Sequence, residues 1–201
     1  YLDVNRIQNE PERALFLIDL PTTGMHRITR TRDRAWAAFA TGQRDTNGAP
    51  AGSGGRVGLI DLETSQVITY GPMSFERHRQ FDWDGIQDLA MVRDGERLAV
   101  YFIYQQQQQT NRPDFQNACR LNGSTACSGL RWIRLEGGEA NLSTERTIPW
   151  SGAQRIAITE DRQSAFIALS TGVQGRLIRW DLGDGTLNNF TWDENVVLDG
   201  N

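Results

Sequence analysis

The chain has 201 residues, of which 38% are hydrophobic, 23% charged and 9% aromatic, a composition typical of a globular protein with a sizeable core. A net charge of −4 and a pI near 5.2 provide no basic surface for nucleic acid, and the sequence contains no run of 18 apolar residues that could span a membrane. All 21 cations are arginine, which we interpret as the codon usage of a GC-rich bacterial genome.

The first apolar segment, Ala14–Leu20 (ALFLIDL), predicts a strand that ends at an Asp-Leu turn. The same pattern, ending in Asp-Leu or its equivalent, returns at Arg56–Leu62, Leu130–Leu135 and Gly175–Leu182. Asp19 and Asp61 are 42 positions apart, and Ile133 and Ile178 are 45 positions apart. Repeats of about 40–45 residues are typical of the four-stranded blades of β-propellers.

A second kind of segment alternates with the first and predicts two strands joined by an acidic turn. It occurs at Arg27–Ala40, Ile86–Val100 and Gln154–Ala168. Within it, apolar residues recur at every second position, as at Leu98, Val100 and Phe102. That period indicates strands, and Asp and Gly between them supply turn chemistry.

These segments together predict an all-β fold and a single domain over residues 1–201, built from antiparallel four-stranded propeller blades. We place blades at about 27–70, 86–149 and 154–192, and assign the strand at 14–20 to a preceding, incomplete blade. Propellers close with four to eight blades, and open sheet edges favour association. We therefore expect this chain to be part of a larger propeller, or to complete one with another chain.

The stretch 104–130 is the predicted insertion loop, because Ile60 and Ile133 are 73 positions apart, one repeat plus about 30 residues. It contains Cys119 and Cys127, which are either two free thiols or a local disulfide; zinc would need two further ligands. We predict the disulfide. It implies an oxidising compartment, so we expect a periplasmic, cell-surface or extracellular location.

The same insertion is the predicted contact surface for a protein partner. Arginine and aromatic side chains dominate interface hot spots, and long loops on rigid scaffolds often carry binding. The predicted contact residues are Arg112, Phe115, Arg120 and Leu121. The alternative is a tolerated surface insertion without function.

An acidic loop around Gly85 is a candidate calcium site, because Asp82, Asp84 and Asp88 place carboxylates close together on a tight turn. The loop resembles a shortened form of the calcium loops of integrin-like propellers, although Gln80 and Trp83 depart from that pattern. The alternative is an acidic loop entering a strand, with Asp88 capping the turn. No other cofactor is expected.

The repeats resemble those of bacterial β-propeller proteins of the YVTN or WD40-like class. The best match is Val92–Val100 (VRDGERLAV) followed by a later Ile-Arg-Leu, and Thr31–Phe39 and Thr159–Ile167 match more loosely. The resemblance covers about residues 14–190. The Gly-His and Trp-Asp pair of eukaryotic WD40 repeats is not reproduced, and the resemblance implies a fold rather than a chemistry.

Two kinds of function remain open from the sequence. The first is an extracytoplasmic binding or scaffold module acting through protein–protein contacts. The second is a propeller enzyme of the lyase or quinoprotein dehydrogenase type, with its active residues at the central channel. His26 and His78 stand alone in sequence, and no nucleophile elbow or His-Glu-x-x-His motif is present. We therefore expect the binding module.

Overall fold

The computed structural model describes residues 25, 27–41, 55–71, 74, 86–105, 128–143, 146–148, 153–159, 161–171, 174–182 and 187–190. This part of the chain contains thirteen β-strands and no α-helix. The strands are joined in antiparallel pairs throughout. The predicted all-β class is confirmed for these residues.

The strands form three sheets that follow one another along the chain. The first sheet is formed by β1 (Arg27–Arg30), β2 (Trp36–Thr41), β3 (Arg56–Asp61) and β4 (Val67–Tyr70). The second is formed by β5 (Ile86–Asp94), β6 (Arg97–Gln105), β7 (Ser128–Glu136), β8 (Glu139–Leu142) and β9 (Arg146–Ile148). The third is formed by β10 (Ala153–Ile158), β11 (Ser164–Thr171), β12 (Gln174–Asp181) and β13 (Leu187–Phe190).

Each sheet is a simple meander in which consecutive strands pair with each other, except at β9. In the second sheet β7 is nine residues long, while β8 pairs only with Ile133–Glu136. The remaining edge of β7, at Ser128–Leu130, pairs with β9. The four-stranded expectation was therefore wrong for this sheet, because one long strand offers an edge that two short strands share.

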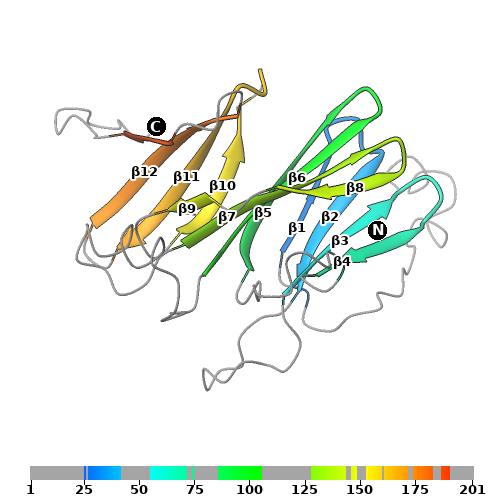
Figure 1. The fold of residues 1–201 in the computed structure, drawn as a ribbon, viewed down its shortest axis with the longest axis horizontal. Helices are drawn as coiled ribbons and strands as arrows, with labels where there is room; N and C mark the ends of the chain where they lie inside the picture. Colours follow the sequence, from blue (N-terminus) through cyan, green and yellow to red (C-terminus); the bar gives the residue numbers. More distant parts are fainter. Residues whose placement is uncertain are drawn as a thin grey trace, which may run out of the picture.

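The three sheets stand side by side, with the first strand of each at the common centre (Figure 1). The first strand of the second sheet, β5, lies against both β1 and β10. Consecutive meanders whose first strands meet in this way form a β-propeller-like arrangement. As a consequence, the turns that follow β1, β5 and β10 converge at one end of the molecule.

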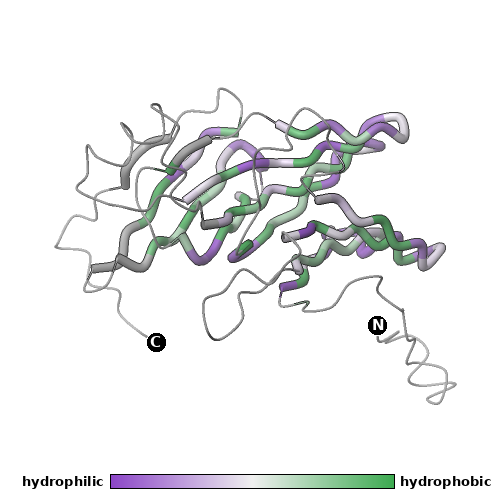
Figure 2. The backbone as a smooth tube through the Cα atoms, turned by 60° about the horizontal axis from the view of Figure 1, so that its bottom comes forward, coloured by the Kyte–Doolittle hydropathy of each residue, from purple (hydrophilic) through white to green (hydrophobic). Residues whose placement is uncertain are grey.

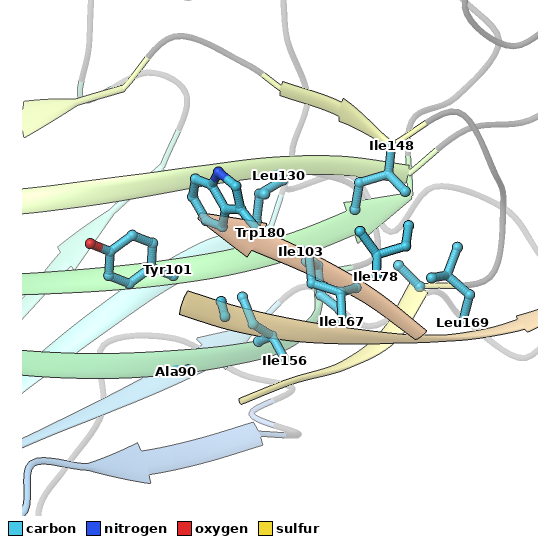
Figure 3. Packing of buried hydrophobic residues seen from close by; sticks show 12 residues of the cluster. Ala90, Tyr101, Ile103, Leu130, Ile148, Ile156, Ile167, Leu169, Ile178 and Trp180 are labelled. Carbon is cyan, nitrogen blue, oxygen red and sulfur yellow. The ribbon is translucent and has the colours of Figure 1, made fainter. Parts of the chain in front are cut away.

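Apolar side chains fill the two spaces between neighbouring sheets, because alternate residues of a strand point to opposite faces. Between the first and second sheets the core contains Ala38, Ala40, Val57, Leu59, Ile86, Leu89, Leu98, Val100, Phe102, Tyr104 and Ile133. Between the second and third sheets it contains a second cluster centred on Trp180 and Ile103 (Figure 3). Hydrophobic residues follow the strands, whereas hydrophilic residues gather at the hairpin tips (Figure 2).

Two aromatic rings lie over glycines on the neighbouring strand. Phe39 of β2 pairs with Gly58 of β3, and Tyr104 of β6 pairs with Gly129 of β7. A Cβ atom at either glycine would overlap the opposing ring. Both rings are at most 1% exposed, so the glycines let large aromatic side chains lie flat on the sheet inside the core.

Candidate binding site at the converging turns

The turn between β1 and β2 is closed by the side chains of Thr31 and Asp33. The Thr31 hydroxyl donates to Asp33 Oδ1 at 2.5 Å and accepts the Trp36 amide at 3.1 Å. Asp33 Oδ1 also accepts the Ala35 amide at 3.1 Å. Thr and Asp at this spacing satisfy the turn's own backbone groups, which is why this local sequence forms a turn.

The turn between β10 and β11 repeats the same hydrogen bonds. The Thr159 hydroxyl donates to Asp161 Oδ1 at 2.5 Å and accepts the Ser164 amide at 3.0 Å. Asp161 Oδ1 accepts the Gln163 amide at 3.0 Å. The residue after each aspartate has the same left-handed backbone, with φ of 61° at both Arg34 and Arg162. The two turns are therefore structural equivalents.

The middle turn, between β5 and β6, is tighter, and Gly95 takes the left-handed position with φ of 58°. Its aspartate, Asp94, is the last residue of β5 and stands opposite Arg97, the first residue of β6, in the strand register. Asp33, Asp94 and Asp161 therefore each stand immediately before a left-handed residue in the first turn of their sheet. This shared position is the basis for comparing the three sheets.

Ion pairs between neighbouring sheets connect these turns. Arg93 Nη1 of the second sheet lies 2.9 Å from Asp33 Oδ2 of the first. Arg162 Nη1 of the third sheet lies 2.9 Å from Asp94 Oδ1 of the second. In both pairs the aspartate belongs to the earlier sheet and the arginine to the later one. We call these the inter-sheet ion pairs.

The hydrogen bonds of the turns shift the acidity of their aspartates. The pKa of Asp33 is below its ordinary value of 3.8 because the Thr31 hydroxyl and the Ala35 amide donate to the carboxylate. The pKa of Asp161 is lowered in the same way by Thr159 and Gln163. These carboxylates therefore stay ionised at neutral pH, as the Asp33–Arg93 ion pair requires.

A cavity of about 400 Å³ lies between the converging turns. We call it the turn cavity; its lining residues are Thr31, Arg32, Asp33, Met91, Val92, Arg93, Ile158, Thr159 and Arg162. All three sheets contribute to it. Its lining residues are three arginines, one aspartate, two threonines and three apolar residues. Its size falls in the range of ligand-binding pockets in proteins.

Asp88 is the one residue of the predicted calcium site that the structure describes. Its carboxylate accepts the Ile156 amide of β10 at 3.0 Å and lies 3.8 Å from Arg27 Nε of β1. Asp88 therefore connects the inner strands of all three sheets. Asp82 and Asp84 lie outside the described residues, so the calcium site stays a prediction. Within the described ranges, no group of three or more His, Cys, Asp or Glu side chains could hold a metal ion.

The predicted partner contacts also lie outside the described residues. This holds for Arg112, Phe115, Arg120 and Leu121, and for Cys119 and Cys127 of the predicted disulfide. The described strands on either side, β6 and β7, pair up to Gln105 and Ser128. The insertion therefore starts and ends at one point of the second sheet, at the opposite end of β6 from the β5–β6 turn.

The sequence reasoning missed the turn cavity and its arginines. A signal was present, because Thr-x-Asp-Arg occurs at both Thr31–Arg34 and Thr159–Arg162. By itself this pattern predicts an acidic turn and does not indicate a cavity. Arg93 has no comparable signal, since nothing local indicates that it reaches a carboxylate 60 positions away. In the described part of the chain, no helix is long and apolar enough to cross a membrane.

Comparisons with known proteins show similarity at the level of structure only. No protein-family model matches the sequence, and neither does any curated protein. The YVTN or WD40-like class therefore remains a resemblance read from the repeats.

Several solved structures resemble the fold. TolB from Acinetobacter baumannii has 17% identity and a TM-score of 0.39, over 84% of this chain and 32% of that one. A xylan beta-1,4-xylosidase from Bacillus halodurans has 12% identity and a TM-score of 0.43, over 87% and 34%. An acylaminoacyl peptidase has 12% identity and a TM-score of 0.42, over 83% and 25%. This chain thus spans a quarter to a third of those chains.

Proposed function

We propose that this chain is a β-propeller binding and scaffold module that works outside the cytoplasm through protein–protein contacts. In this proposal the three sheets are part of a larger propeller or surface assembly. Further blades, from the same or another chain, would continue the row of sheets. The observation that carries the proposal is that each inter-sheet ion pair joins an aspartate of the earlier sheet to an arginine of the later sheet.

Each inter-sheet ion pair offers a turn aspartate to an arginine of the next sheet. Asp161 occupies in the third sheet the place that Asp33 occupies in the first, with Oδ1 engaged in the same turn hydrogen bonds. Asp33 Oδ2 accepts Arg93 of the following sheet. This equivalence supports the proposal that Asp161 Oδ2 would accept an arginine from a fourth sheet.

The outer face of the third sheet supports the same proposal. Ala165, Ile167 and Leu169 of β11 belong to the core shared with the second sheet. Because side chains alternate along a strand, Phe166 and Ala168 lie on the opposite face, where both are only half-buried. An apolar strand face beside an acidic turn is a suitable surface for a further blade that carries an arginine.

The insertion at 104–130 is a second contact surface in this proposal. The described strands on either side of it, β6 and β7, end at Gln105 and Ser128, and neither residue lines the turn cavity. Its contact residues would be Arg112, Phe115, Arg120 and Leu121, held in one shape by a Cys119–Cys127 disulfide. An oxidising compartment outside the cytoplasm would preserve that bond.

Affinity capture from the envelope fraction of the source organism tests the proposal. The purified chain is the bait, beside Asp161→Arg, a variant lacking residues 106–128, and the control Glu136→Arg, which reverses an exposed carboxylate paired within its own sheet. We expect the chain and the control to capture the same β-sheet partner. Asp161→Arg should reduce that capture at least tenfold, through like-charge repulsion at the fourth-sheet contact.

Native mass spectrometry completes the test. A chain that remains a 22.6 kDa monomer, with all variants capturing the same proteins equally, would overturn the proposal. Loss of capture only in the deletion variant would assign the contact to the insertion and reject the fourth-sheet contact. Loss only in Asp161→Arg would do the reverse.

A further inference from the structure

We propose that the turn cavity is a binding site for a small organic carboxylate with an apolar body. This function is separate from the sheet contacts proposed above, because it uses the cavity lining rather than Asp161 or the outer face of β11. Three features of the cavity support this proposal: its arginines, the ion pairs that hold two of them in place, and the apolar residues beside them.

The charge of the lining favours an anion. Arg32, Arg93 and Arg162 come from the first, second and third sheets respectively, and Asp33 is the one carboxylate among the lining residues. The lining therefore contains three arginines and one aspartate, and Asp94, which pairs with Arg162, stands just outside it. A carboxylate matches the planar fork of a guanidinium, which offers two parallel N–H donors.

The existing ion pairs hold two of these guanidinium groups in place without using all of their donors. Arg93 donates through Nη1 to Asp33 and through Nε to the Gly95 carbonyl. Arg162 donates through Nη1 to Asp94. A guanidinium has five N–H donors, so each group can bind a ligand while it remains anchored. Anchored donors lose less conformational entropy when a ligand binds.

The remaining surface of the cavity specifies the rest of the ligand. Met91, Val92 and Ile158 provide apolar contacts beside the arginines. A hydrocarbon body next to a carboxylate would cover these side chains, which a bare inorganic anion cannot do. The volume of about 400 Å³ accommodates a body of several carbon atoms.

Hexanoate and its uncharged counterpart hexanamide test this proposal directly. Each is titrated into the full chain at low salt, and amide chemical shifts and calorimetry follow binding. We expect saturable binding of hexanoate with shifts at the turn-cavity residues, and at least tenfold weaker binding of hexanamide. Inorganic phosphate should compete weakly, because it lacks the apolar body.

A matched pair of variants separates the ligand contact from the inter-sheet ion pair. Arg162→Gln removes a guanidinium from the cavity, whereas Asp94→Asn weakens the same ion pair but keeps the guanidinium. We expect Arg162→Gln to weaken hexanoate binding at least tenfold, and Asp94→Asn to weaken it by less than threefold, because only the anchoring of Arg162 is lost. Arg93→Gln removes the guanidinium that the second sheet contributes, and should also weaken hexanoate binding at least tenfold.

Three results would overturn the proposal. The first is no saturable binding of hexanoate, and the second is equal binding of hexanamide. The third is unchanged hexanoate binding in Arg162→Gln or in Arg93→Gln; because the two arginines belong to different sheets, one variant still tests the proposal if the other does not fold. None of these results affects the fourth-sheet contact, which is tested at Asp161.

Discussion

The two carboxylate oxygens of Asp33 have different roles, one in the local turn and the other in a contact between sheets. In Asp33, Oδ1 accepts hydrogen bonds from Thr31 and Ala35 within the turn, and Oδ2 accepts Arg93 from the next sheet. One side chain therefore sets the local turn and joins two sheets. The exposed ion pair alone contributes little, because solvent screens it. Its value is in orienting the sheets and in holding Arg93 beside the turn cavity.

Acid should destabilise the protein through these turns. The pKa values of Asp33 and Asp161 are lowered from 3.8 in the folded protein, so their stabilising effect is fully present above about pH 4 and is lost as the pH falls through their lower folded values. At Asp61, partial burial raises the pKa, but amide hydrogen bonds from Thr64 and Glu63 outweigh it. We expect a smaller free energy of unfolding at about pH 3 than at pH 6.

Urea denaturation at both pH values checks this prediction. Asp161→Asn should reduce the difference between the two pH values, because the group that takes up the proton is removed. The control Glu139→Gln replaces an exposed carboxylate at the start of β8 and should leave the difference as it is. An unchanged difference in Asp161→Asn would contradict the prediction.

At the scale of the element, strand length and side-chain size determine how each sheet is completed. The nine residues of β7 exceed what the four-residue β8 can cover, so β9 pairs with the free part of its edge. The aromatic-over-glycine pairs place Phe39 and Tyr104 flat against β3 and β7. Tyr104, lying flat, and the small residues Ala38 and Ala40 face the space between the first and second sheets and let these two sheets approach each other closely, whereas Phe39 lies on the other face of β2 with Ala37 and Ile60.

The glycine beneath Tyr104 should tolerate no larger residue. A Cβ at Gly129 would overlap the Tyr104 ring, which is 1% exposed and has no free space to move into. We expect Gly129→Ala to reduce the free energy of unfolding by about 1–3 kcal/mol, measured by urea denaturation. The control Gly71→Ala places its Cβ at 3.4 Å from Arg56 Cγ, a flexible side chain, and should change stability by less than about 0.5 kcal/mol. Equal effects would contradict the explanation.

At the scale of the whole molecule, the first strands of the three sheets meet around Asp88. Its carboxylate, 14% exposed, accepts the Ile156 amide and lies near Arg27. The apolar cores on either side are separate clusters, so this polar contact is where the first and third sheets share one residue. The arrangement gives the molecule a polar connection at its centre and apolar contacts farther out.

Removing this carboxylate should weaken the whole assembly of sheets. Asp88→Ala leaves the Ile156 amide without its acceptor, and we expect a loss of about 1–3 kcal/mol in the free energy of unfolding. Hydrogen exchange at the Ile156 amide should also become faster. The control Asp94→Ala removes an inter-sheet carboxylate that is 79% exposed, and should cost less than about 1 kcal/mol. Similar losses in both variants would show that Asp88 has no central role.

The sequence by itself determined most of the strands and the acidic turns between them, because both depend on neighbouring residues. Alternating apolar positions in Leu98–Phe102 predicted β6, and the acidic segment within Arg27–Ala40 predicted a turn, whereas β9 was not expected. Only the tertiary structure decided what the turns do together. Arg93 meets Asp33 across 60 positions, and Asp88 meets Ile156 across 68. No local pattern specifies such contacts: they arise when packing of the apolar cores brings the first strands of three sheets together, which also creates the turn cavity.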